Sequence, residues 1–300
     1  MILRAVAGRR LDDGLAALFP QLSKTRIRRA IDWGGCRVFD SVVRVASRPL
    51  KEGDLLTLAV TESGRFAELT LGEADILFED EDYVAIDKPA GVYCQRTPYQ
   101  LKGTVEFAVG LYLKSRGVAE PVRVIHRLDR GTSGVMFFPK TRRAAAHVSG
   151  LLKEGKVEKI YRALVGGAPE RDEWTVDAPI GNVGKSRFAV ARSGKAARTA
   201  FRVLAAGRGA ALVEARPLTG RTHQVRVHLA HGGLPIVGDD VYGGAPAPRM
   251  MLHCRSMAFA AADGRPVAAT APPDAAFTEA CGRHGIPAAW QVRRTGWNPG

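Results

Sequence analysis

Residues 126–135 read HRLDRGTSGV, in which Asp129 stands between two arginines and ahead of a glycine-containing turn. Such a carboxylate could be a surface ion-pair partner, a metal ligand, or a nucleophile held by cationic neighbours. An exposed ion pair contributes at most about 1 kcal/mol. If the segment is extended, Arg127 shares a face with Asp129 and Arg130 does not, because side chains alternate along a strand. A second arginine, from elsewhere in the chain, is then needed beside the carboxylate.

Two glycines follow the aspartate and predict how it is presented. Gly131 and Gly134 give the backbone the freedom that a tight turn requires. We therefore expect Asp129 to project from a loop, into a groove, just before the strand VMFFPK (135–140) begins. A free aspartate is a weak nucleophile in water, so a chemical role requires both partial burial and a cation within hydrogen-bond reach.

The chain around this loop reads as a mixed fold. Strand-like runs dominate from residue 70 onward, and helical stretches interrupt them without regular alternation, at 103–117 and 142–156. This order predicts an α+β unit with a mixed, mostly antiparallel sheet. The stretch GRTHQVRVHLAHGG (220–233) alternates apolar residues like a strand, but its closing Gly-Gly pair fits a short helix equally well.

The first 60 residues predict a separate small α/β unit. Ser23 is a good N-cap for a helix ended by Gly34-Gly35, with Ile27, Ala30 and Ile31 on one face. Short strands are expected in CRVFDSVVRV (36–45) and DLLTLAV (54–60). The other helix face carries three candidate RNA-binding cations, although spacing alone favours an ordinary solvated surface: Lys24, Arg28 and Arg29.

Charge and composition limit the possible functions. The 300 residues carry a formal net charge of +14, so a polyanion, nucleic acid first, is the expected partner. Net charge is +5 over residues 1–60, −7 over 61–90 and +16 over the remainder, which predicts domains at 1–62 and 70–290. The four cysteines form no CxxC pair, which argues against a structural zinc site and favours a reducing cytoplasm. No apolar run is long enough to be a membrane span or a signal peptide.

The string HRLDRGTSGV resembles HRLDxxTSG, the signature of the RluA-type pseudouridine synthases, whose aspartate is catalytic. Further family segments are resembled, in the required order, by KPAGVYCQ, KIYRALVGG, RPLTGRTHQVRVHLAHGGLPIVGDDVYG (216–243) and MLHCRSMAF. The resemblance spans about residues 70–260 and implies a pseudouridine synthase fold. It assigns the active-site tyrosine to Tyr161, the carboxylate's arginine partner to Arg221, and a wedge that replaces the flipped base to Arg127. Gly131 departs from the family, which usually has an acidic or small polar residue there.

The N-terminal stretch has a resemblance of its own. LSKTRIRRAIDWGGCRVF, within residues 10–60, is similar to the ribosomal-protein S-four-like RNA-binding domain. That similarity implies a role in RNA binding for the basic helix. It also favours ribosomal RNA over transfer RNA as the target, because ribosomal-RNA members of the family carry such a domain. We expect a monomer.

The implied reaction gives an independent reason for residues of these types to be present. Making pseudouridine requires breaking a glycosidic carbon–nitrogen bond, turning the freed uracil and joining its carbon 5 to the sugar. Asp129 could attack carbon 1′, add to carbon 6 of the base, or abstract the 2′ proton, and the sequence does not choose among these. Tyr161 could stack on the uracil and help to remove the carbon 5 proton. No redox change or phosphate transfer occurs, so neither cofactor nor metal is expected.

Two other classes of function compete. A protein with the same scaffold could bind or fold RNA without chemistry. A metal-dependent nuclease would instead use the histidine cluster, but the sequence has no HExxH and no carboxylate at ligand spacing. Solvent-exposed or hydrogen-bonded histidines are the better interpretation of this cluster: His223, His228, His231 and His253.

Overall fold

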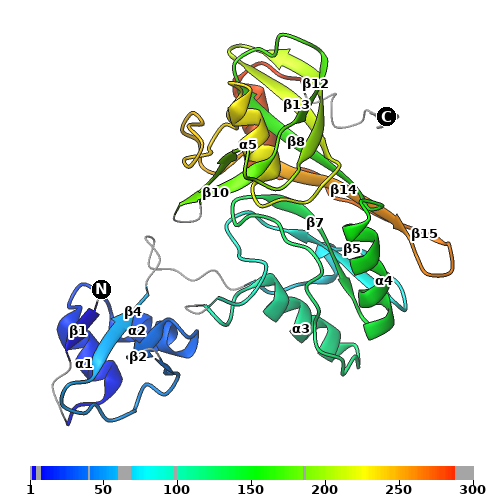
Figure 1. The fold of residues 1–300 in the computed structure, drawn as a ribbon. Coiled ribbons are helices and arrows are strands. Elements are labelled where there is room, and N and C mark those ends of the chain that lie inside the picture. Colours follow the sequence, from blue (N-terminus) through cyan, green and yellow to red (C-terminus); the bar gives the residue numbers. More distant parts are fainter. Residues whose placement is uncertain are drawn as a thin grey trace. The chain divides into compact units, whose positions relative to one another are not determined.

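The computed structural model describes residues 8–39, 41–59, 69–97, 100–184 and 187–287, together with the backbone of 2–4. The chain divides into two compact units, one formed by 1–71 with 92–122 and the other by 72–91 with 123–300 (Figure 1). The boundary predicted between the domains 1–62 and 70–290 falls largely on residues 60–68, outside the described residues. The domain limits therefore stay a prediction.

The first unit has a four-stranded antiparallel sheet with two helices beside it. The strands run in the order β1 (Ile2–Arg4), β4 (Leu55–Leu58), β2 (Cys36–Val38) and β3 (Ser41–Val42). Helix α1 (Leu11–Leu18) packs on α2 (Lys24–Asp32), and their leucines and isoleucines form one buried core with the sheet. The predictions for α2 are confirmed. Ser23 Oγ accepts from the Arg26 N–H at 3.3 Å, and the predicted apolar face is buried.

A third helix, α3 (Val105–Ser115), is also part of the first unit and confirms the helix expected within 103–117. Thr104 caps it by accepting a hydrogen bond from the Phe107 N–H at 3.3 Å. The segment before it is fastened to the end of α2, because the Leu101 N–H donates to the Trp33 carbonyl at 2.6 Å. Residues 92–122 thus belong with the N-terminal elements.

The second unit is built on a nine-stranded sheet. Along the sheet the strands are β5 (Ile76–Glu79), β6 (Tyr83–Lys88), β7 (Ser133–Pro139), β14 (Leu252–Ala260), β8 (Glu158–Gly166), β13 (Ala210–Pro217), β12 (Arg198–Gly207) and β9 (Glu173–Asp177), with β15 (Pro266–Thr270) paired to β14. Among the described strands of this sheet, only β7 and β14 pair in parallel. The mixed, mostly antiparallel sheet predicted from the sequence is confirmed.

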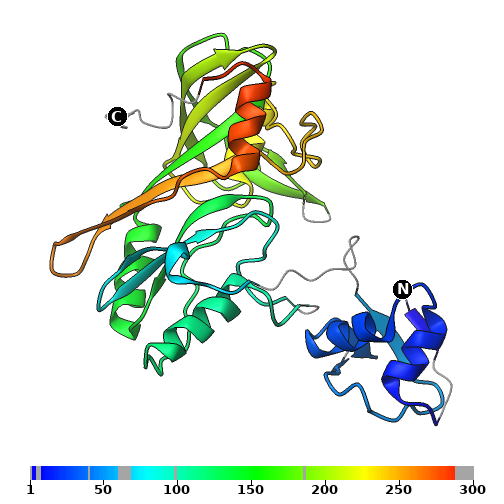
Figure 2. The same cartoon turned by 180° about the vertical axis from the view of Figure 1, so that it is seen from behind.

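Helices and smaller elements complete this unit. They are the short helix η1 (Glu73–Asp75), α4 (Arg142–Lys153), α5 (Gln224–His231), α6 (Ala275–Arg283) and a separate hairpin of β10 (Ile180–Gly184) and β11 (Arg187–Val190). Figure 2 shows α6 lying beside the strands, and its Phe277 is fully buried in the core that contains Phe201 and Leu212. Burial of each such side chain contributes about 1.5–3 kcal/mol. All helices in the described ranges are too short or too polar to cross a lipid bilayer.

Residues 224–231 form a helix, which resolves the alternative left open by the sequence. Val225 and Leu229 join the main core, whereas Val227 packs on the opposite side of α5 with Ile180 and Ala197. A helix buried on both sides loses the one-sided apolar spacing by which helices are recognised. The apparent strand-like alternation therefore comes from burial on two sides of one helix.

Position 134, the last residue of the TSG string, requires glycine because two strands pack closely there. The parallel pairing places it opposite Cys254 of β14, with a φ of +109°. A Cβ at this position would meet the backbone carbonyl of Cys254, so side chains are excluded by contact as well as by conformation. The close approach of these two strands fixes the start of β7 and, with it, the loop that carries Asp129.

Candidate active site

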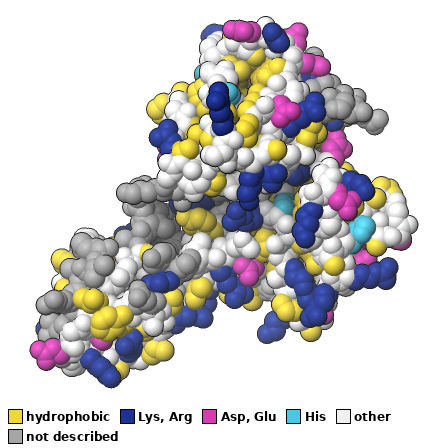
Figure 3. Space-filling view, viewed as in Figure 1, with side chains coloured by type: hydrophobic (Ala, Val, Ile, Leu, Met, Phe, Trp, Pro, Cys, Tyr) yellow, Lys and Arg dark blue, Asp and Glu magenta, His cyan; other side chains and the backbone are white. Residues whose placement is uncertain are grey.

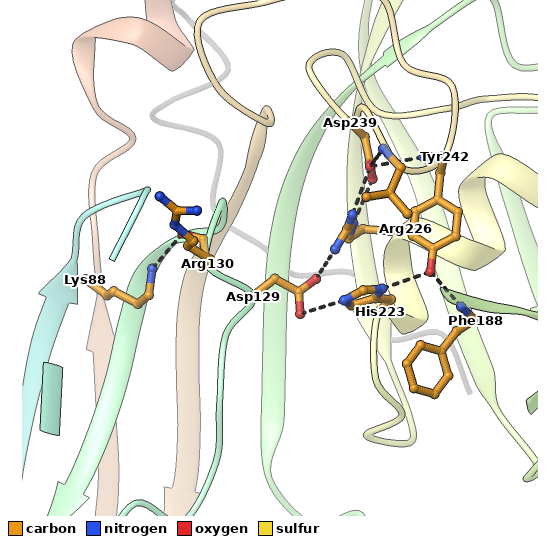
Figure 4. Close-up of polar contacts among 9 residues, drawn as sticks. Lys88, Asp129, Arg130, Phe188, His223, Arg226, Asp239 and Tyr242 are labelled. Atoms are coloured by element: carbon orange, nitrogen blue, oxygen red, sulfur yellow. Dashed lines mark hydrogen bonds and ion pairs between the residues drawn. The ribbon is translucent and has the colours of Figure 1, made fainter. Parts of the chain in front are cut away.

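Asp129 lies in a tight turn just before β7. The Thr132 N–H donates to the Asp129 carbonyl at 3.0 Å, which closes the turn. The carboxylate is partly accessible, with 26% of its side chain exposed. Arg226 Nη1 donates to Asp129 Oδ2 at 2.9 Å, and His223 Nε2 lies 3.8 Å from Oδ1 (Figure 4). A cation from a distant part of the chain therefore stands beside this carboxylate, as the sequence argument required.

Arg226 is held in place by a second carboxylate. Its Nε and Nη2 donate to Asp239 Oδ2 and Oδ1 at 2.7 and 2.9 Å, a bidentate pair that fixes the plane of the guanidinium. The Arg226 guanidinium carbon also lies over the ring of Tyr242, 4.9 Å from the ring centre. Burial alone would favour loss of the proton, but the hydrogen bonds and charges of Asp239 and Asp129 raise the pKa of Arg226.

The predicted pairing of Arg221 with Asp129 is wrong. Arg221 precedes α5, and its Nε donates to the Ala196 carbonyl at 2.8 Å. Its backbone N–H donates to Gln224 Oε1 at 2.9 Å, near the start of the helix. The arginine that reaches the carboxylate, Arg226, lies inside the first turn of α5. The sequence left strand and helix open for residues 224–231, so it did not place Arg226 at the start of a helix.

His223 is a site residue that the sequence argument placed only in a possible metal cluster. It precedes α5 in the left-handed conformation, with φ of 57°. Its Nδ1 lies 2.8 Å from Tyr242 Oη, which accepts from the Phe188 N–H at 3.2 Å. Burial lowers the pKa of His223, and the charge of Asp129 opposes that shift only in part. The imidazole is therefore neutral at neutral pH.

Lys88 fastens the aspartate loop to β6. This lysine of the KPAG segment is fully buried, and its ammonium donates to three backbone carbonyls, those of Pro89, Arg130 and Thr132, at 2.9, 3.2 and 2.7 Å. The Gly91 N–H also donates to the Arg130 carbonyl, at 2.7 Å. The KPAG segment thus fixes the backbone on the C-terminal side of Asp129.

Two other predicted site residues belong to the same unit. Tyr161 is half-buried on β8, opposite Cys254 of β14, and the two side chains are hydrogen-bonded. It packs against the core cluster to which α5 contributes Val225. Arg127 is exposed, and its positive charge contributes to the lowered pKa of His223, so its guanidinium lies in the electrostatic neighbourhood of the site.

The three cations proposed on α2 lie in the first unit, and acidic residues of α1 face two of them. Arg28 Nε donates to Asp12 Oδ2 at 2.7 Å, and Lys24 forms an ion pair with Asp13. Hydrogen bonds from Arg10 and then Arg28 lower the pKa of the buried Asp12 to about 2. The third cation, Arg29, stacks over Trp33. The positive field of this helix is therefore partly neutralised within the unit.

Of the other histidines in the cluster, His228 and His253 are hydrogen-bonded within the fold and His231 is exposed, in line with the sequence argument. His253 Nε2 lies 3.0 Å from the Ala271 carbonyl, so this nitrogen carries the proton, and Nδ1 accepts from Ser133 Oγ at 2.9 Å. His228 is held in the same way by the Ala178 carbonyl and Thr199. Across the described ranges, no three His, Cys, Asp or Glu side chains gather as metal ligands would.

Comparison with known proteins identifies the class. The model of the family described as RNA pseudouridylate synthase matches residues 82–231, a range that includes Asp129, Tyr161 and Arg226. The solved structure of human RNA Pseudouridylate Synthase Domain Containing 4 superimposes with a TM-score of 0.62 at 26% identity, covering 71% of this chain and 93% of that one. The sheet described above is thus the pseudouridine synthase fold.

Sequence relatives place the chain more closely. An uncharacterised RNA pseudouridine synthase of Mycobacterium bovis is 37% identical over 285 residues, covering 89% of this chain and 91% of the relative. Ribosomal large subunit pseudouridine synthase D of Nitrosomonas europaea is 36% identical over 242 residues, covering 79% and 70%. The chain therefore belongs to the RNA pseudouridylate synthase family, in its RluA-type branch, as its signature predicted.

Proposed function

We propose that this RNA pseudouridine synthase isomerises uridines in ribosomal RNA, with Asp129 as the catalytic carboxylate. One observation carries the assignment: Asp129 remains partly exposed while a buried arginine, itself fixed by Asp239, donates to one of its oxygens. Such an arginine keeps a carboxylate ionised in a water-poor site without occupying its second oxygen. Arg226 takes the role first assigned to Arg221.

The two carboxylate oxygens of Asp129 have different surroundings, which suggests different tasks. Oδ2 accepts from Arg226, whereas Oδ1 lies 3.8 Å from His223 Nε2, beyond hydrogen-bond distance. Oδ1 is therefore the oxygen with lone pairs available for carbon 1′, carbon 6 or the 2′ proton. Neutral His223 neither competes for this oxygen as a cation nor adds positive charge beside it. Tyr161 is proposed to stack on the uracil and to assist removal of the carbon 5 proton.

RNA binding is proposed to involve both units. Lys and Arg side chains gather between α5 and β7 on the face seen in Figure 3, where a polyanion would meet the second unit. Arg127, exposed on the aspartate loop, is proposed to fill the space left when the uridine leaves its stack. We propose that residues 1–62 form an S-four-like RNA-binding domain, in which Lys24, Arg28 and Arg29 contact phosphates, and that residues 70–290 form the catalytic domain.

Ribosomal RNA is proposed as the target because relatives at 35% and 36% identity are named for the large ribosomal subunit. Transfer RNA is the alternative target. A cytoplasmic monomer without a membrane partner fits this proposal, and the four cysteines are free thiols, as a reducing compartment requires.

The target is tested by tritium release from RNA labelled at uridine carbon 5. Transcribed large-subunit, small-subunit and transfer RNA are incubated separately with the enzyme. Release from large-subunit RNA alone is the expected result. Release from transfer RNA alone would refute the proposed target while leaving the activity established.

A further inference from the structure

Lys159 is a cation that the proposed chemistry has not yet used. It lies on β8 two residues before Tyr161, so the two side chains leave the same face of the sheet, about 7 Å apart along the strand. Ile160 and Arg162, which point to the other face, are buried. The lysine therefore shares the face of the sheet on which Tyr161 packs against the core containing α5.

The ammonium of Lys159 is near both segments that build the site. Its Nζ is 3.8 Å from the point where a Cβ would stand on Gly220, in the exposed loop before α5. His126, the first residue of the signature, is also within electrostatic range of Lys159. Burial first, and the charge of Lys159 second, lower the pKa of His126 to about 3. Lys159 is thus near the aspartate segment and near the loop that leads to Arg226.

This ammonium has no partner within the described part of the chain. Lys159 is half-buried, and no described residue forms a hydrogen bond or ion pair with it. By contrast, the fully buried Lys88 has three carbonyl acceptors. Removing an ammonium from water costs free energy unless an acceptor or an anion replaces the water. Burial accordingly lowers the pKa of Lys159.

The substrate's chemistry indicates which anion could pair with this ammonium. Uracil and ribose are neutral, so the phosphodiester is the only anionic group that RNA brings to this site. The position beside exposed Gly220 places the ammonium toward the rim, where a backbone passes, and Tyr161 is one same-face step further along the strand.

We propose that Lys159 binds a backbone phosphate adjoining the uridine whose base stacks on Tyr161. This inference rests on the proposed function, because it takes RNA as the substrate and Tyr161 as the base platform. Lys159 and Tyr161 together would then fix the phosphate and the base of one nucleotide from a single rigid strand.

The test measures binding without turnover. Lys159→Met is made in the Asp129→Asn background, with Lys156→Met as control, because Lys156 is exposed and paired with Glu154 at 2.8 Å. The probe is a fluorescein-labelled RNA stem-loop with a single loop uridine, titrated over a series of salt concentrations. Lys159→Met should raise Kd about tenfold and reduce the salt slope by about 1. Lys156→Met should change neither.

A second probe carries an uncharged methylphosphonate at one linkage beside the uridine. If Lys159 binds that phosphate, Lys159→Met and its parent should bind this probe equally. Equal effects of both lysine substitutions on the native probe would overturn the proposal, as would a loss of kcat at unchanged Kd when Lys159→Met is made in the wild-type enzyme. Lys159→Arg retains the charge and should keep the slope, and thermal melting checks folding, which Lys159→Met should not weaken. Absent tritium release by wild type would refute the proposed function separately, because binding needs no turnover.

Discussion

The structure and the sequence assign the pairing with Asp129 to different arginines, Arg226 and Arg221, which are five residues apart. We predict that Arg226→Met abolishes most activity and that Arg221→Met leaves most of it. Arg226 is 7% exposed in its side chain and donates three hydrogen bonds to carboxylates. Arg221 is exposed, and its side chain donates to a backbone carbonyl. The two substitutions remove the same positive charge from nearby positions in the chain.

The expected magnitudes follow from these contacts. A hydrogen bond to a charged group contributes about 1.5–3 kcal/mol, so loss of the Arg226–Asp129 bond should lower kcat/KM by roughly 10- to 150-fold. Stability should fall by about 3 kcal/mol, because the buried Asp239 loses its partner. Two backbone N–H groups still reach Asp239 Oδ1, which places the cost at the lower end of the usual range. Arg221→Met should cost about 0.5 kcal/mol or less.

The assay is tritium release under single-turnover conditions, with urea unfolding measured on the same preparations. Asp239→Asn, alone and combined with Arg226→Met, separates stability from catalysis, because the amide oxygen can still accept from the loop N–H groups. The double variant should regain most of the lost stability and little of the lost activity. Recovery of activity together with stability would refute the reasoning, as would a larger loss of activity in Arg221→Met than in Arg226→Met.

Four further substitutions test the framework of the site. Lys88→Met should destabilise the fold by several kcal/mol in chemical unfolding and reduce tritium release, because three buried carbonyls lose their donor. Gly134→Ala should yield little folded protein by circular dichroism, whereas Gly150→Ala, where a Cβ has open space, should fold normally. Burial lowers the pKa of His253 from 6.5 to about 4, so as pH falls the imidazole is protonated first in the unfolded state. The free energy of unfolding should therefore drop by up to about 3 kcal/mol between pH 6.5 and about pH 4. His253→Gln should flatten this pH dependence in acid titrations. Burial, and then the charge of Asp274, raise the pKa of Asp87 from 3.8 to about 6, so stability is lost as pH rises through that value; Asp87→Asn should stabilise by up to about 3 kcal/mol near about pH 8 and have no effect near about pH 3, and equal effects at both would contradict this.

The sequence predicted local elements well because their signals are local. Ser23 caps α2 as expected. The strand-like runs of the second unit form a mostly antiparallel sheet, also as expected. Helix α1 was missed, since it is short and has no side-chain cap. Residues 224–231 were ambiguous because burial on two sides removed the usual amphipathic spacing.

The site was predicted only in part, because its partners come from distant segments. The signature singled out Asp129, but its ion pair with Arg226 spans 97 positions and depends on where α5 begins. Asp239, which fixes Arg226, lies within the family-like block 216–243, but the sequence assigned no role to it. Lys88 likewise donates to two carbonyls of the aspartate loop, which are 42 and 44 positions away in the sequence. The roles of Tyr161, Arg127 and the α2 cations stay predictions.

The central claim is that Asp129 performs the chemistry. The most direct measurement is tritium release from carbon-5-labelled large-subunit ribosomal RNA by wild type and by Asp129→Asn, with RNA binding measured for both. Asn keeps the size of the side chain and removes its charge, so the account predicts unchanged folding, similar binding and no release by the variant. Release by Asp129→Asn at a rate near that of wild type would contradict the account.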